Sequence, residues 1–379
     1  MKRRFVLILL SFSVLISAFA IPIHALPNSI SVSAKAATLI DGSSGEVFYE
    51  KNAHERLGMA STTKIMTALV VAEEAEIDKV VKIPKAAVGI EGSSVYLTEG
   101  ETLTVRQLLY ALLLSSANDA AVALAICVSG SVEAFVELMN RRAQDMGLED
   151  THFTNPHGLY DEEHYTTAYE LALISAEALN NPLLREIAST YKTTIPKGEA
   201  ENGRFLLNHN KMLRLYDGAI GLKTGFTKKT GRCLVSAAER DGLMLIAVSL
   251  NAPDDWNDHC AMLDLGFDNY ESVTLYETGE FRYPLPITNG KEQYVIISNL
   301  QDITLTLPKV RSELRCQIKT LCRFEFAPIK QGTALGELVC EVGERSVKSS
   351  LVAAYDVEPT PTKKGFLAKI LDFFLSLFS

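Results

Sequence analysis

Apolar and polar positions follow two different periods along the first 270 residues. Short alternating runs at 36–40 and 46–50 flank Asp41-Gly42-Ser43-Ser44-Gly45, which predicts a β-hairpin with glycines in its turn. Apolar residues three and four apart predict helices over 61–74, 105–114, 118–128, 132–145 and 167–179. Alternation returns in predicted strands over 220–226, 232–237 and 243–251. This order indicates one mixed antiparallel sheet flanked by helices, not repeated βαβ units.

The helical period stops after about Tyr270. Short alternating runs separated by turn residues follow, over 293–297, 303–307, 316–321, 337–342 and 348–355. This pattern is typical of a small β-sandwich. We therefore predict an α+β protein, with the helices and first sheet in residues 26–271 and an all-β domain in residues 272–358.

The N-terminal residues have the three-part order of a secretory signal peptide. Basic residues occupy positions 2–4, an almost unbroken apolar run extends from Phe5 to Ile16, and Ala18-Phe19-Ala20 supplies small residues for a signal peptidase. We predict a signal peptide in residues 1–25. An uncleaved membrane anchor is the alternative, although the apolar run is shorter than the roughly 20 residues that a spanning helix needs.

The C-terminal residues 359–379 join a linker, Pro359-Thr360-Pro361-Thr362, to an amphipathic segment. Lys363, Lys364 and Lys369 supply positive charge. The apolar side chains of the segment recur at helical spacing, at Phe366, Ile370, Phe373, Phe374, Leu377 and Phe378. The pattern predicts a helix that lies in the membrane interface, with its lysines near anionic headgroups. Docking of this helix on its own protein is the alternative. With export, the prediction is an extracytoplasmic protein attached peripherally to the cytoplasmic membrane.

Charge and cysteine content exclude several classes. The net charge of −9 argues against a nucleic-acid-binding surface, which needs a basic face. The six cysteines form no Cys-x-x-Cys pair, which argues against metal ribbons and thioredoxin-like redox sites. Export would permit disulfides. We expect mostly free, buried thiols, with Cys316–Cys322 as a weak disulfide candidate.

Ser61-Thr62-Thr63-Lys64 opens the first predicted helix. Residues three apart share a helix face, so Lys64 is expected beside the Ser61 hydroxyl. A serine becomes a nucleophile when a base removes its proton, and a lysine can be that base if burial and a second cation lower its pKa. The helix N-terminus also offers free N–H groups to a developing oxyanion. The spacing predicts acyl-enzyme chemistry at Ser61.

This motif is not distinctive by itself, because Ser189-Thr190-Tyr191-Lys192 repeats it. We interpret the second copy as a solvated helix end. Two further elements favour Ser61. Ser116-Ala117-Asn118 begins a helical stretch, and Lys223-Thr224-Gly225 lies on a predicted strand, where the glycine lets a ligand approach the backbone. Each is explained alone by a helix cap or a strand end, but the three together predict one site.

Ser-x-x-Lys, Ser-x-Asn and Lys-Thr-Gly, in this order, resemble the signatures of the penicillin-recognising serine hydrolases. Four longer segments are similar to the low-molecular-mass D-alanyl-D-alanine carboxypeptidases, namely residues 60–68, 116–120, 155–159 (Asn-Pro-His-Gly-Leu) and 221–225. The resemblance runs from about Ala36 to Tyr270, and the predicted sandwich and tail resemble the rest of that family. It implies a β-lactamase/DD-peptidase-like fold.

The resemblance implies that Ser61 attacks the carbonyl between two terminal D-alanines of a peptidoglycan stem peptide. It assigns catalytic roles to the nucleophile, its base, the proton relay and an orienting amide, which are Ser61, Lys64, Ser116 and Asn118. It assigns substrate binding to Lys223, Thr224, Gly225 and Phe226, with the N–H groups of Ser61 and Phe226 as the oxyanion hole. Water then releases the shortened peptide, β-lactams acylate the same serine, and no cofactor is needed.

One family feature is missing. Some relatives carry an arginine after the last sheet strand that helps to bind the substrate carboxylate, whereas residues 251–259 contain none. Arg232 is a candidate substitute, and a surface charge at a strand start is the alternative.

A cluster of histidines and acids, His152, His157, His164 and Asp161–Glu163, lacks the His-Glu-x-x-His spacing of a zinc site. We expect no metal there and a structural role for His157.

Two other functions stay open at this point. A serine β-lactamase needs a glutamate that activates the deacylating water, and Glu177-Ala178-Leu179-Asn180 resembles that motif but is one residue short. A catalytically silent wall-binding scaffold would also retain this fold, although every expected catalytic side chain is present.

Overall fold

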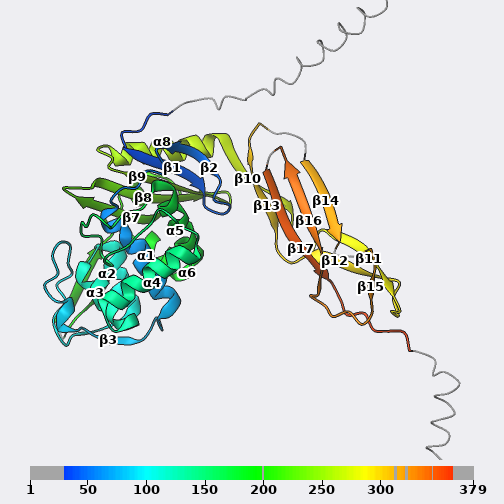
Figure 1. Cartoon of the computed structure of the whole chain (residues 1–379), viewed down its shortest axis with the longest axis horizontal. Helices are drawn as coiled ribbons and strands as arrows, with labels where there is room; N and C mark the ends of the chain where they lie inside the picture. Colours follow the sequence, from blue (N-terminus) through cyan, green and yellow to red (C-terminus); the bar gives the residue numbers. More distant parts are fainter. Residues whose placement is uncertain (1–29, 199, 311–313, 321–322, 344, 362–379) are drawn as a thin grey trace, which may run out of the picture. The chain divides into compact units, whose positions relative to one another are not determined.

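Five antiparallel strands form the sheet of the first domain, in the order β2-β1-β9-β8-β7 (Figure 1). Their bounds are Ala36–Asp41 (β1), Val47–Lys51 (β2), Ala219–Thr227 (β7), Gly231–Arg240 (β8) and Leu243–Leu250 (β9). The computed structural model describes residues 30–361 except 199, 311–313, 321–322 and 344. The sheet confirms the predicted hairpin and the three later strands, and the pairing of β1 with β9 joins these two groups.

The two faces of the sheet follow from side-chain alternation. Leu39 and Leu245 lie on the face covered by α8 (Asp255–Asn269). This helix packs so closely that a Cβ added at Gly266 would overlap the Leu245 side chain. Ile40 and Ile246, one position on in each strand, join the cluster formed with the other helices. The sheet is thus buried on both faces. Helix α8 was not predicted from the apolar periodicity.

Seven helices make up the block between the strands. They are α1 (Lys64–Glu74), α2 (Val105–Leu114), α3 (Asn118–Ser129), α4 (Val132–Asp145), α5 (Ala168–Asn180), α6 (Pro182–Ser189) and the single turn α7 (Met212–Leu215). Five of them were predicted to within a few residues. Capping explains the starts: Thr104 and Gln107 form a capping box at α2, and the Thr167 side chain accepts from the Glu170 N–H at α5.

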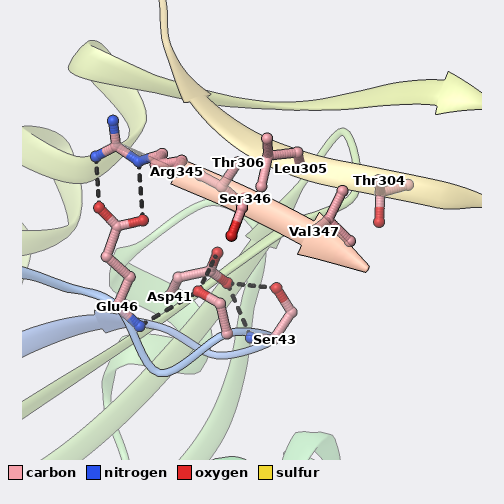
Figure 2. Close-up of a pocket in the computed structure, with 10 residues that line it drawn as sticks. Asp41, Ser43, Glu46, Thr304, Leu305, Thr306, Arg345, Ser346 and Val347 are labelled. Carbon is pink, nitrogen blue, oxygen red and sulfur yellow. Dashed lines mark hydrogen bonds and ion pairs between the residues drawn. The ribbon is translucent and has the colours of Figure 1, made fainter. Parts of the chain in front are cut away.

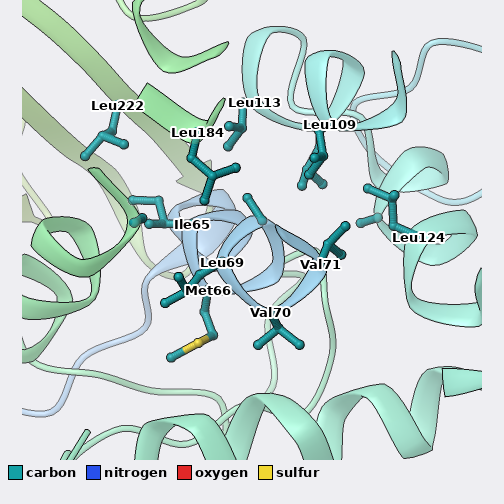
Figure 3. Close-up of a cluster of buried hydrophobic side chains, with 14 of the residues drawn as sticks. Ile65, Met66, Leu69, Val70, Val71, Leu109, Leu113, Leu124, Leu184 and Leu222 are labelled. Atoms are coloured by element: carbon teal, nitrogen blue, oxygen red, sulfur yellow. The ribbon is translucent and has the colours of Figure 1, made fainter. Parts of the chain in front are cut away.

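Helix α1 lies at the centre of this block, as Figure 3 shows. Every residue from Lys64 to Val71 is buried. Its apolar side chains contact α2, α3, α6 and β7 through Leu109, Leu124, Leu184 and Leu222. A helix that is apolar on all sides packs in a core instead of covering one. Lys64, the predicted base, is therefore attached to a helix that packs inside the core.

Two short strand pairs lie outside the main sheet. β3 (Val80–Lys82) pairs with β4 (Thr102–Thr104), and β5 (Lys192–Lys197) pairs with β6 (Ala200–Leu207). The sequence analysis predicted neither pair. The β5–β6 hairpin matters for the site, because His209 follows it directly.

The second domain is all-β, as predicted. β10 (Tyr270–Tyr276) pairs with β13 (Ile303–Pro308), and six strands form a sheet in the order β14-β16-β17-β12-β11-β15. The bounds of these six are Arg282–Thr288 (β11), Tyr294–Asn299 (β12), Leu314–Thr320 (β14), Glu325–Phe326 (β15), Ala334–Val342 (β16) and Arg345–Ala353 (β17). Their inward side chains form a separate core around Val295, Ile297 and Leu351.

The predicted disulfide was wrong. Cys316 bonds to Cys340, its direct partner in the β14–β16 pairing, with the two Cα atoms 4.1 Å apart. Three other cysteines are free: Cys233 is buried, while Cys127 and Cys260 are half-buried. Sequence spacing favoured a nearby cysteine, whereas cross-strand register determines which Cβ atoms meet.

The predicted signal peptide and amphipathic tail lie outside the described residues. Among the described helices, none alone is both long and apolar enough to span a bilayer, and only α3 with α4 meet that test as a pair, across a bend of 84°.

Candidate active site

Two of the cavities in the described part of the chain differ clearly in the residues that line them. One, of about 600 Å³, is lined by Asp41, Ser43 and Ser44 of the β1–β2 turn and by residues of β13 and β17 (Figure 2). The Glu46 carboxylate binds Arg345 at its edge, with Oε2 2.8 Å from Nε. None of the predicted site residues lines it. The other, of about 400 Å³, is lined by Ser61, Ser116, Thr224, Gly225 and Phe226, so we take it as the candidate active site.

Ser61 lies in a 3₁₀ turn, Ala60–Thr63, that continues into α1. The turn keeps residues three apart on one side, and Lys64 Nζ lies 3.1 Å from Ser61 Oγ. Ala60 has a positive φ of 49°, a strained conformation for a residue with a side chain. The predicted nucleophile–base pair is therefore formed at the entrance of the central helix.

Lys64 is fully buried and satisfied by three acceptors. Besides Ser61 Oγ, its ammonium donates to Asn118 Oδ1 at 2.8 Å and to the His157 carbonyl at 2.6 Å. Burial holds the pKa of Lys64 well below its usual range, and the positive charge of Lys223 lowers it further, while Asp119 opposes the shift. A lowered pKa makes the neutral form, which can act as a base, easier to reach than in a solvent-exposed lysine.

Ser116 and Asn118 occupy the junction between α2 and α3. Ser116 is buried with a positive φ of 59°, and Asn118 is the first residue of α3. Asn118 spans two groups, because its Oδ1 accepts from Lys64 and its Nδ2 donates to the Glu91 carbonyl at 2.5 Å. Within the described residues, Ser116 Oγ has no hydrogen bond to Ser61, Lys64 or Lys223, although it lines the same cavity as Ser61.

Lys223, Thr224, Gly225 and Phe226 follow one another on β7, the terminal strand of the sheet. Lys223 is buried and donates to its neighbour's carbonyl at 2.9 Å, and burial lowers its pKa to about 7. A Cβ at Gly225 would lie 3.0 Å from the Ser61 amide nitrogen. Glycine therefore lets the strand pass this close to the nucleophile without a tight contact.

The segment 155–159 holds the start of α1 in place. The Pro156 carbonyl accepts from Thr67 Oγ1 at 2.6 Å, and the His157 carbonyl accepts from Lys64. Gly158, at φ +86°, packs so closely on Ala60 that a Cβ would overlap its carbonyl oxygen. This role of Gly158 was not predicted, since the sequence indicates the segment only as a family motif.

The histidines near this segment have structural partners. His164 Nε2 lies 2.7 Å from Thr63 Oγ1, and burial lowers the pKa of His164 to about 3. Burial and the charge of Lys64 lower the pKa of His157 to about 4. Among the described residues, no three His, Cys, Asp or Glu side chains lie together as metal ligands.

A cationic and aromatic group completes the cavity, and most of it was missed. Arg232, the predicted candidate, bonds to Asp255 Oδ1 at 2.7 Å and lies over the Trp256 ring at 5.8 Å. Lys211 lies 5.7 Å from the centre of the same ring. Ser93 and His209 also line the cavity. These residues come from separate loops and strands, so no spacing in the sequence indicates that they meet.

The residues behind the alternative interpretations lie in other surroundings. Ser189 is the exposed last residue of α6 and donates to the Arg185 carbonyl at 2.8 Å, which confirms the predicted helix end. Glu177, the β-lactamase candidate, lies within α5 and forms an ion pair of 2.6 Å with Arg142. Neither residue lines the cavity around Ser61.

Comparison with known proteins identifies the family of this chain. Residues 23–254 match the family model described as D-alanyl-D-alanine carboxypeptidase, and residues 270–359 match the C-terminal domain of penicillin-binding protein 5. The carboxypeptidase DacF of Bacillus subtilis is 33% identical, covering 93% of this chain and 92% of its own. DacC of Escherichia coli is 31% identical, covering 92% of this chain and 89% of its own.

Solved structures give the same result for the fold. Penicillin-binding protein 5 of Haemophilus influenzae superposes with a TM-score of 0.72 at 28% identity, covering 87% of this chain and 99% of its own. PBP3 of Streptococcus pneumoniae, described as a peptidoglycan synthesis regulatory factor, gives 0.76 at 26% identity, covering 87% and 100%. The chain is therefore a member of the D-alanyl-D-alanine carboxypeptidase family of hydrolases.

Proposed function

We propose that this enzyme removes the terminal D-alanine from peptidoglycan stem peptides through an acyl-enzyme on Ser61. The observation that carries the proposal is the buried Lys64 ammonium, held 3.1 Å from Ser61 Oγ by Asn118 and the His157 carbonyl. In its neutral form Lys64 takes the Ser61 proton as the hydroxyl attacks the carbonyl between the two D-alanines. The protein groups needed for this step are all pre-positioned.

We propose the remaining roles from the resemblance to the family. The Ser61 N–H and the N–H of Phe226 on the terminal strand stabilise the oxyanion. Ser116 passes a proton to the leaving amine with the help of Lys223, and Thr224 binds the terminal carboxylate. Asn118 binds the substrate amide and orients Lys64. A water molecule then hydrolyses the Ser61 ester, which restores the hydroxyl and releases the shortened peptide.

We further propose an extracytoplasmic enzyme that binds β-lactams at Ser61. Residues 1–25 act as the signal peptide, 26–271 as the catalytic domain, 272–358 as the sandwich, and 359–379 as linker and membrane-anchoring helix. The family matches to residues 23–254 and 270–359 support the two central boundaries. The Cys316–Cys340 bond also favours an oxidising compartment.

Product analysis tests this function. Purified disaccharide pentapeptide is incubated with the enzyme, and the products are identified by mass spectrometry. Loss of one D-alanine supports the proposal, whereas an intact substrate beside measurable binding to peptidoglycan would support the scaffold. A parallel nitrocefin assay separates the β-lactamase alternative: slow deacylation fits the proposal, and rapid turnover contradicts it.

The two lysines predict opposite effects of pH on kcat/KM. As pH falls through the pKa of Lys64, this base gains a proton and acylation slows. As pH rises through about 7, Lys223 loses its proton and no longer assists the leaving group or its carboxylate. Above that pKa the rate should fall about tenfold per pH unit. In Lys223→Arg the cation persists, so the alkaline limb should move to higher pH; an unchanged limb would assign it to another group.

Arg232 is proposed to assist Thr224 in binding the substrate carboxylate. The Arg232 side chain is 43% exposed, and the buried carboxylate of Asp255 fixes the orientation of its guanidinium. We expect Arg232→Gln to raise KM by about 10- to 100-fold for a peptide with a free carboxylate, because one charge-assisted hydrogen bond to the substrate is lost. A C-terminal peptide amide should show little change. Arg240→Gln, at the far end of β8, is the control. Equal losses on acid and amide would argue for a purely structural role.

A further inference from the structure

Four large aromatic side chains are exposed at one end of the second domain. This end, which we call the exit end, consists of residues 288–294, 323–330 and 354–361 (Figure 1). Phe324 is 49% exposed and Phe326 is 57% exposed, and Tyr294 and Tyr355 are exposed as well. Single exposed apolar side chains are normal, whereas several that gather in one place indicate an interaction surface.

Strand pairing fixes the backbone that carries the two phenylalanines. β15 lies parallel to β11, with Phe326 opposite Thr288. The Ala327 N–H also donates to the Thr288 carbonyl at 3.1 Å. The rings of Phe324 and Phe326 meet edge to face, with their centroids 5.6 Å apart. These two rings therefore form one apolar tip, held on a defined backbone.

The chain leaves the second domain directly beside this apolar tip. The Thr360 N–H donates to the Asn289 carbonyl at 2.9 Å, and the Thr360 hydroxyl donates to the Gly290 carbonyl at 2.6 Å. Asn289 and Gly290 follow Thr288, the residue opposite Phe326. The linker to the C-terminal segment therefore begins at the tip.

The linker is short, which limits how far the apolar tip can lie from the C-terminal segment. Phe366, the first aromatic residue of that segment, is five residues beyond Pro361. Five residues span at most about 18 Å when fully extended. If residues 363–379 lie in the membrane interface, as proposed above, the exit end lies within about that distance of the bilayer.

The charges of the exit end do not favour an anionic surface. Its charged side chains include more acids than bases, namely Lys291, Arg323, Lys330, Glu292, Glu325, Asp356 and Glu358. Lys291 pairs with Glu358, and Lys330 Nζ lies 3.1 Å from Asp356 Oδ2. Attraction of this end to a bilayer must therefore come from apolar contact.

We propose that Phe324 and Phe326 enter the membrane interface and form a second contact with lipid, in addition to the C-terminal segment. The inference rests on the membrane attachment proposed above. Aromatic side chains bind at the headgroup boundary of a bilayer, and binding strengthens with the apolar area buried there. Two contacts joined by a short linker bind more tightly together than either does alone. The second contact also fixes which end of the domain faces the lipid.

The first test measures binding of the secreted chain, residues 26–379, to vesicles of phosphatidylcholine and phosphatidylglycerol by co-sedimentation. The double variant Phe324→Ser/Phe326→Ser should lose about tenfold in partition coefficient, because two rings are no longer removed from water. High salt should weaken binding of both proteins but leave their ratio unchanged, since the tip is uncharged. Leu300→Ser is the control, because Leu300 is 61% exposed and follows β12 at the opposite end from Tyr294.

The second test locates the tip in the bilayer by fluorescence. The chain contains one tryptophan, Trp256, which gives the same background signal in every protein compared. Vesicles with brominated acyl chains should quench the fluorescence that Phe326→Trp adds. They should not quench the fluorescence that Leu300→Trp adds. Release of D-alanine from soluble pentapeptide should be unchanged in the double variant, because neither phenylalanine lies in the catalytic domain.

The outcomes separate this contact from attachment itself. If the wild type binds vesicles and the double variant binds equally well, the inference fails and attachment by residues 363–379 stands. Quenching of Phe326→Trp no stronger than that of Leu300→Trp would overturn it too. A wild type that does not bind vesicles contradicts the proposed attachment as well. If the wild type forms a dimer without vesicles and the double variant does not, the aromatics contact a second copy of the chain and the inference is wrong.

Discussion

Ser61→Ala is expected to abolish D-alanine release and covalent labelling by benzylpenicillin, whereas Ser189→Ala should leave both unchanged. Both serines begin a Ser-x-x-Lys sequence, so the pair tests whether the motif or its surroundings supply the chemistry. Only Ser61 Oγ lies beside a buried ammonium, at 3.1 Å from Lys64 Nζ. We expect a loss of at least about 10⁴-fold in kcat, the scale seen when a catalytic nucleophile is removed.

The measurements are intact-protein mass after incubation with benzylpenicillin and D-alanine release from pentapeptide. Wild type and Ser189→Ala should gain the mass of one penicilloyl group, and Ser61→Ala should gain none. Labelling of Ser61→Ala would locate the nucleophile elsewhere. Ser189 Oγ donates to the Arg185 carbonyl on an exposed helix end, so its loss should also change stability little.

Among the substitutions proposed, Gly158→Ala is expected to lower the free energy of unfolding most. It should also reduce activity. At φ +86° any side chain is strained, and here the new Cβ would also overlap the Ala60 carbonyl oxygen. The backbone must move, and with it the His157 carbonyl that binds Lys64. The free energy of unfolding should fall by about 3 kcal/mol or more, since the strain of a left-handed alanine adds to the cost of the steric overlap.

Gly147→Ala separates these two causes. Gly147 has a similar φ of +72°, but nothing lies within 4 Å of its added Cβ. The free energy of unfolding of Gly147→Ala should fall only by the strain of a left-handed alanine, about 1 kcal/mol. Chemical denaturation of both variants measures the difference. Equal losses would show that the contact between Gly158 and Ala60 is not a constraint on the fold.

The sequence was most informative where chemistry depends on local spacing. Ser61 and Lys64 are three residues apart on one helical segment, so their contact follows from helix geometry alone. The association of Ser116 and Lys223 with them rested on the family resemblance, because no local rule brings residues from distant segments together. The structure places Ser116 at the same cavity as Ser61, and the charge of Lys223 acts on Lys64.

Elements with buried polar side chains escaped prediction. α8 was missed because Asp258 and His259 interrupt its apolar period, yet both are buried. Asp258 accepts from the N–H and hydroxyl of Ser33, each at 2.7 Å, so a residue 225 positions away satisfies its charge. The β5–β6 hairpin was missed for a related reason, since its alternation is interrupted by Pro196 and Gly203. Partners distant in the sequence determine whether such segments form helices or strands, and apolar periodicity cannot identify those partners.

The position of β7 at the end of the sheet has a further consequence. A terminal strand has N–H and C=O groups with no neighbouring strand, which invites pairing with another protein molecule and aggregation. Natural proteins usually protect such an edge, but this one must stay open if substrate is to reach Thr224 and Phe226. The irregular register at Ala219–Gly221 and the 3₁₀ turn packed at Gly225 shorten the accessible stretch. Mutations that stabilise the protein by covering this edge should therefore reduce turnover.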